Sequence, residues 1–194
     1  MCTKALMLFV VLLSLSPLCM GQSRNLLLNP DADLGAKHWR TVGEAKVEAT
    51  ENNFCFVLRN GGSFLQDVDL PDNAVGQYAV LIGRAASERI NDDGAITDLP
   101  YLYGYMMEQA PPNAGRIVEY LQGQQMRAST GMTNEWVNVW GIFKVPEKTK
   151  KIRFFLNQAR RKGVPHNGSA ARFDHVGLYL FQTKEEAEAF VTYR

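Results

Sequence analysis

The chain has 194 residues, of which 46% are hydrophobic and 21% charged, and its formal net charge is +1 at pH 7. This length and composition are typical of a single globular domain with a sizeable core. A charge so close to zero argues against nucleic acid or an anionic membrane surface as partner, since both require a concentrated basic surface.

Residues 1–21 have the pattern of a secretory signal peptide. Lys4 gives a positive start, an apolar run follows over 5–13, and Cys19-Met20-Gly21 resembles a small-x-small cleavage site. The apolar run is too short to span a bilayer, so we predict a secreted, extracellular protein without membrane insertion; an uncleaved anchor is the alternative. Lys4 is the leader's only charged residue, so 20 basic and 20 acidic residues remain in the predicted domain, 22–194.

Of the three cysteines, only Cys55 lies outside the predicted signal peptide. A secreted domain with one cysteine has no internal disulfide, so its fold must rest on packing, or on packing plus a metal. Cys55 stands between Phe54 and Phe56 in a strand-like run, which favours a buried, inert thiol over a reactive one.

The first stretch of the predicted mature chain is 25–39, NLLLNPDADLGAKHW. It predicts a short apolar strand that ends at Asn29, because Pro30 fixes its own φ and disfavours helical backbone before it. Asp31 and Asp33 follow in a turn, where their oxygens suit a calcium ion. The alternative is that both carboxylates only bond to their own turn backbone.

Further along, short segments rich in β-branched and aromatic residues recur at about ten-residue spacing. The alternation of apolar and polar residues predicts strands, and Asn60-Gly61-Gly62 predicts a hairpin turn. Residues 87–100 show no periodicity and predict a long exposed loop. The predicted strands are 45–49, 54–59, 63–68, 77–86, 101–109, 117–126, 136–145, 151–158 and 170–181.

Only the C-terminal tail predicts a helix. Thr183 and Glu186 have the spacing of a capping box, and Ala187, Phe190 and Val191 form one apolar stripe. Many short strands and one terminal helix indicate an all-β fold, an antiparallel β-sandwich with a short C-terminal helix.

The two ends of the chain carry a family resemblance. The opening 25–35 with Trp39, the strand that begins at Trp136, and the closing run 171–180, ARFDHVGLYL, resemble jelly-roll carbohydrate-binding modules of the galactose-binding-like superfamily. The resemblance implies a jelly roll over nearly the whole of 22–194 and a non-catalytic, lectin-like function. It also implies that Trp39 and Trp136 pack the sandwich.

The resemblance further implies a structural calcium between the first and last strands. On matching positions, the acidic ligands are Asp33 and Asp174, and the turn carbonyl is that of Asp31. A calcium ion bound by both ends of the domain would cross-link them, which is the stabilising role that disulfides have in other secreted proteins. The chain departs from the family pattern at Asp33, where a longer Glu is usual, and at His175, which replaces a second Asp. The alternative is that a backbone amide or Arg172 holds Asp174.

Two stretches present aromatic rings suited to stacking on a sugar. Tyr101, Tyr103 and Tyr105 alternate with apolar residues and share one side of a strand, and Trp140 lies opposite the apolar face of its own strand. Arg84, Asn157, Gln158 and Glu108 are the predicted polar partners that could supply hydrogen bonds. Half-buried packing is the alternative for every ring. Asn167-Gly168-Ser169 is an N-glycosylation sequon, consistent with a secreted glycoprotein.

We therefore predict a secreted, non-catalytic module that binds a glycan or polysaccharide. The second hypothesis is an extracellular-matrix or interaction protein that uses the same scaffold for a protein partner. A hydrolase is the third and least favoured hypothesis. The chain has no Gly-x-Ser-x-Gly or His-Glu-x-x-His motif, and its three histidines are scattered along the sequence.

Overall fold

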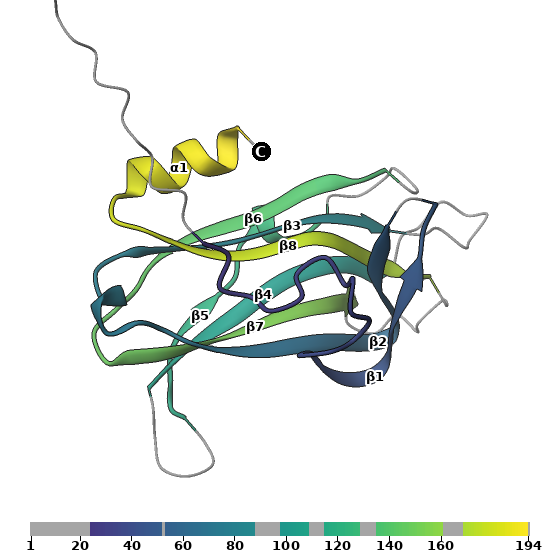
Figure 1. Cartoon of the computed structure of the whole chain (residues 1–194), viewed down its shortest axis with the longest axis horizontal. Coiled ribbons are helices and arrows are strands. Elements are labelled where there is room, and N and C mark those ends of the chain that lie inside the picture. Colours follow the sequence, from purple (N-terminus) through teal and green to yellow (C-terminus); the bar gives the residue numbers. More distant parts are fainter. Residues whose placement is uncertain are drawn as a thin grey trace, which may run out of the picture.

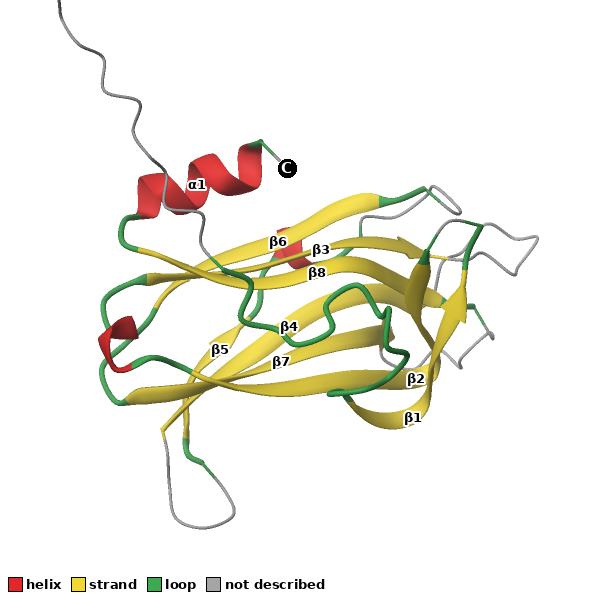
Figure 2. Cartoon of the chain, viewed as in Figure 1, coloured by secondary structure: helices red, strands yellow, loops and turns green. Residues whose placement is uncertain are grey.

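The computed structural model describes residues 24–51, 53–87, 98–108, 115–128, 135–160 and 169–193. Strands dominate this part of the chain, as Figure 2 shows, and the predicted all-β sandwich is confirmed. The strands are β1 Arg40–Ala49, β2 Phe54–Asp69, β3 Tyr78–Ser87, β4 Asp98–Glu108, β5 Ile117–Leu121, β6 Val137–Lys144, β7 Thr149–Arg160 and β8 Ala171–Phe181. Two short 3-10 turns, η1 Asp72–Ala74 and η2 Gln124–Met126, and one helix, α1 Lys184–Thr192, complete the described elements.

The strands form two facing layers (Figure 1). One contains β8, β3 and β6, and the other contains β5, β4, β7 and β2, with β1 paired to β2. Every described pairing is antiparallel. Side chains from the inner faces of both layers fill one core, whose largest fully buried members include Phe56, Phe64, Phe154 and Phe173.

Strand β2 joins the two layers. Its first half pairs with β8 and its second half with β7, so one continuous strand bends between them. The prediction of a hairpin at Asn60-Gly61-Gly62 was therefore wrong: the glycines are the bend in β2. A Cβ on Gly62 would overlap the carbonyl oxygen of Glu44 on β1, so the close approach of β1 requires glycine there.

Helix α1 covers the outer face of the β6, β3 and β8 layer (Figure 1). The predicted capping box is confirmed, since Thr183 accepts from the amide of Glu186 and the Glu186 carboxylate accepts from the amide of Thr183. Ala187 and Val191 are buried against this outer face together with Val80 and Tyr179. Among the described residues there is no helix with the length and apolarity that crossing a membrane requires.

Candidate functional site

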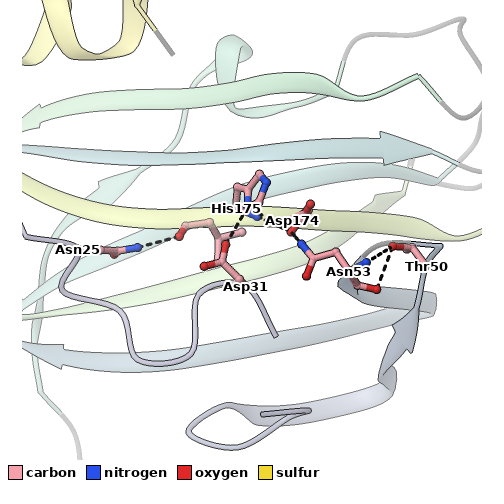
Figure 3. A network of polar contacts seen from close by, with 7 residues as sticks. Asn25, Asp31, Thr50, Asn53, Asp174 and His175 are labelled. Atoms are coloured by element: carbon pink, nitrogen blue, oxygen red, sulfur yellow. Dashed lines mark hydrogen bonds and ion pairs between the residues drawn. The ribbon is translucent and has the colours of Figure 1, made fainter. Parts of the chain in front are cut away.

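The N-terminal segment is tied to the last strand. Asn25 donates to the carbonyl of Val176 (3.0 Å) and accepts from the amide of Leu178 (3.1 Å), and the amide of Leu26 donates to the carbonyl of Leu178 (2.8 Å). The prediction of a first strand in this segment was wrong, because residues 25–28 form no regular β-ladder. Isolated hydrogen bonds to β8 hold the segment instead. Trp39 is buried against Phe56, as the resemblance implied. The segment from Asn25 to Asp31 therefore lies beside strand β8, as Figure 3 shows.

This contact brings two of the three predicted metal residues together. One ligand atom each from Asp31, Asp174 and His175 lies within 4.8 Å of the other two. His175 Nδ1 is 2.8 Å from Asp31 Oδ1 and 3.5 Å from Asp174 Oδ1 (Figure 3). The third predicted residue, Asp33, is exposed and lies outside the cluster, because the fully buried Ala32 before it turns the chain with a left-handed φ of 60°.

Asp174 is the least exposed member of the cluster, with 13% of its side chain accessible. Its Oδ1 accepts from the amide of His175 (2.8 Å) and from the side chain of Asn53 (3.3 Å), which Thr50 holds in turn (Figure 3). A backbone amide therefore holds this carboxylate, as the alternative to calcium predicted.

The cluster only partly suits calcium. Two carboxylates are hard oxygen ligands, but calcium prefers six to eight oxygens, and the third group is the imidazole of His175. A mixed set of carboxylate and imidazole suits first-row divalent ions such as Zn²⁺ or Mn²⁺ better. Calcium at this position stays a prediction.

A second feature lies on the outer face of the other layer. Tyr101, Tyr103 and Tyr105 project from the same side of β4, while Leu102, Gly104 and Met106 between them are buried or face the core. Phe155 of β7 and Tyr120 of β5 join them through the strand register. We call these five rings the aromatic strip: Tyr101, Tyr103, Tyr105, Tyr120 and Phe155.

The rings of the strip have different roles. Tyr103 stacks almost parallel on Tyr101 (centroids 5.3 Å apart, planes at 16°) and on Phe155 (4.4 Å, 7°). Burial raises the pKa of the Tyr103 phenol, which is consistent with a supporting position. Tyr105 makes only steeply inclined contacts, at 84° with Tyr120 and 68° with Phe155. Tyr120 is 59% exposed, so it offers the most accessible ring.

Planar polar side chains flank the strip. Arg153 lies opposite Tyr105 and donates two hydrogen bonds to Asp67, at 2.6 and 2.9 Å. These bonds from Arg153 hold the pKa of Asp67 below its ordinary value. Asn157 lies opposite Tyr101 and accepts from Ser63 (2.6 Å). Fixed guanidinium, carboxylate and carboxamide groups are the partners that sugar hydroxyls require.

The structure does not bring the remaining two predicted ligand residues to the strip. Trp140 and Arg84 lie in the β6–β3 pairing, on the outer face of the other layer. Arg84 places its guanidinium 5.6 Å from the ring centre of Trp136. Trp136 is half-buried against a small cluster of Cys55, Val57 and Ala170, which is separate from the core between the two layers.

Comparisons with known proteins bear on the fold. No family model matches the sequence, and no curated protein matches it. Among solved structures, the chain is similar to the enzymatically active domain of tailspike protein 4 from bacteriophage CBA120, with 14% identity and a TM-score of 0.56; the match covers 81% of this chain and 21% of that one. It is also similar to a xylan-binding domain of CBM family 22 (12% identity, TM-score 0.51, 82% and 97% coverage). The chain is similar as well to the CBM22-1 xylan-binding domain from Paenibacillus barcinonensis Xyn10C, with 12% identity and a TM-score of 0.50; the match covers 83% of this chain and 97% of that one.

The chain has the jelly-roll fold of carbohydrate-binding modules. The resemblance predicted from the chain's two ends is thus confirmed at the level of the fold. At these identities the likeness carries no ligand with it, because one fold serves many functions.

Sequence reasoning missed several residues of the two features. The alternation in 151–158 placed Phe155 outward, and an outward aromatic was a signal that could have been used. Tyr120 gave no such signal, because its partners are distant in sequence. His175 stood out as the residue that replaces a second Asp, but its contact with Asp31 spans 144 residues and cannot be read from the chain. Gln158 is not free for a ligand: it is buried and bonds to Gly61 and Ser169 at the bend of β2. The predicted glycosylation site, Asn167, lies outside the described residues.

Proposed function

We propose that this protein is a secreted, non-catalytic module that binds a saccharide chain through the aromatic strip. The observation that carries the proposal is a row of aromatic rings on β4, β5 and β7, in which Tyr101 is buried, Tyr103, Tyr105 and Phe155 are partly buried and Tyr120 is exposed. Arg153, Asp67 and Asn157 flank this row. The jelly-roll fold that the chain shares with xylan-binding domains supports it.

The chemistry of the strip matches a sugar. The C–H faces of a pyranose stack on aromatic rings, while its hydroxyls need fixed donors and acceptors nearby. Tyr105 and Tyr120 provide rings on which no other ring of the described residues stacks in parallel. The pair of Asp67 and Arg153 provides both an acceptor and donors beside Tyr105.

Affinity electrophoresis in gels that contain soluble xylan, β-glucan or galactan tests the proposal. We expect at least one polysaccharide to retard the wild type, and Tyr105→Ala and Tyr120→Ala each to weaken the retardation by about threefold to tenfold, the range for one aromatic contact. Tyr193→Ala is the matched control, because this tyrosine is 87% exposed next to α1 and far from the strip.

Two results would contradict the proposal. The first is no retardation by any of the polysaccharides, which would favour a protein partner for the exposed rings. The second is equal retardation of Tyr105→Ala, Tyr120→Ala and the wild type, which would place any binding elsewhere on the molecule.

A further inference from the structure

Two hollows adjoin Trp140 along the edge strand β6. One has a volume of about 330 Å³ and is lined by Trp140, Val137 and Asn138 of β6 with Gln124, Gln125 and Arg127. The other, of about 270 Å³, continues along Trp140 towards Gly141 and Ile142 and reaches Lys184 and Glu188 of α1. The indole therefore forms a wall shared by both hollows.

The hollows exist because η2 packs on the edge strand β6. Met126 is fully buried, and its sulfur would lie 2.6 Å from a Cβ placed on Gly141. The absent side chain at Gly141 thus lets η2 approach β6 closely and sets the depth of the hollows. At the far end, Lys184 pairs with Glu188 at 2.8 Å, so this rim contributes no net charge.

The lining is rich in free carboxamides. Gln124, Gln125 and Asn138 are exposed, and none of their side chains hydrogen-bonds to another residue in the part of the chain that the structure describes. A carboxamide offers two donor hydrogens and an acceptor oxygen. Three of them around one indole can satisfy hydroxyl groups while the indole contacts a C–H face.

Arg127 is the one unpaired charge on the lining among the described residues, and it is fixed in place. Its guanidinium lies 4.6 Å from the centre of the Tyr101 ring, a distance at which a cation and an aromatic face attract each other. Its remaining donors are available to the hollow. A hollow with several amides and one arginine suits a polyhydroxyl ligand and disfavours a cation.

We infer that the Trp140 hollows are a second saccharide site, which takes neutral hexose or pentose units with the indole of Trp140 as the stacking surface. The two hollows together fall within the range for small-molecule sites, about 300–1,000 Å³, and so suit one or two sugar rings. The inference rests on the proposed function for its ligand class only. Arg127 lines the first hollow and also contacts the ring of Tyr101, so the second site adjoins the strip at that residue.

Tryptophan fluorescence tests the second site on the full-length protein. Xylohexaose, cellohexaose and β-1,4-galactotriose are titrated into the wild type and into Tyr105→Ala/Tyr120→Ala, in which the strip is disabled. We expect at least one of them to change the emission of both proteins with similar affinity. Trp140→Phe should remove the change and keep the apolar packing against Val80 and Ile82.

Asn138→Ala and Gln125→Ala should each weaken this response by about threefold to tenfold. Gln182→Ala, an exposed carboxamide outside the hollows, should leave it unchanged. No emission change with any of the three oligosaccharides overturns the second site, and so does an unchanged response in Trp140→Phe. Loss of the response in Tyr105→Ala/Tyr120→Ala alone also overturns it, while leaving the strip as the binding surface.

Discussion

The ion pair between Asp67 and Arg153 should stabilise the folded protein, and the stabilisation should depend on pH. Arg153 donates to both carboxylate oxygens at 2.6 and 2.9 Å, and Arg40 adds a third bond at 3.1 Å. The side chains of Asp67 and Arg153 are 26% and 30% exposed, so solvent screens the pair only in part. Asp67→Asn keeps the shape and removes the charge. We expect it to lower the free energy of unfolding by about 1 kcal/mol near neutral pH.

The pH dependence has a definite sign. The bonds from Arg153 hold the pKa of Asp67 below its ordinary value of 3.8, so the folded state keeps the charge at pH values where the unfolded chain has begun to protonate. The stabilisation is therefore complete above the unfolded-state pKa and is lost as the pH falls through the lower folded-state pKa. The difference between wild type and Asp67→Asn should be constant between about pH 7 and 5 and shrink towards about pH 3.

Urea unfolding followed by circular dichroism measures this difference. Asp72→Asn is the matched control, because its carboxylate is fully exposed and its contact with Lys150 is 3.4 Å long; we expect a change close to zero. A loss of stability in Asp67→Asn that is as large at about pH 3 as at pH 7 would refute the electrostatic reasoning. Equal losses in Asp67→Asn and Asp72→Asn would refute it as well.

Three further predictions concern the fold and the N-terminal contact. Gly62→Ala should destabilise the protein by about 2–4 kcal/mol in urea unfolding, because its Cβ would overlap backbone of Glu44, whereas Gly123→Ala has room and should be nearly neutral. Burial raises the pKa of the Cys55 thiol, so a thiol reagent should modify it slowly in the native state and rapidly in urea. Calcium should raise the melting temperature more in His175→Asp than in the wild type, because a carboxylate replaces the imidazole.

Each of the three has a result that contradicts it. Equal stability of the two glycine variants would mean that β1 can move away from β2 at no cost. Fast native labelling of Cys55 would show that the thiol is open to solvent. If calcium leaves the melting temperature of both proteins unchanged relative to an EDTA-treated sample, the contact between the N-terminal segment and β8 is not a calcium site.

The local patterns of the sequence determined most of the secondary structure. Alternation over two residues reports which side of a strand a residue occupies, so it placed the three tyrosines of β4 on one side and Val139 on the core side of β6. The spacing of Thr183 and Glu186 likewise determined where α1 begins, since a capping box involves only one turn of backbone. These features depend on residues a few positions apart, which is why the chain alone reveals them.

Only the tertiary structure decided which of these residues meet. It made the glycines at 61–62 a bend in one strand rather than a hairpin, because β1 lies against Gly62 from a separate part of the chain. It joined His175 to Asp31 across 144 residues, and it placed Trp140 in the β6 layer and the strip in the layer of β4, β5 and β7. Such contacts follow from the order and register of the strands, which the alternation of residues within a single strand does not specify.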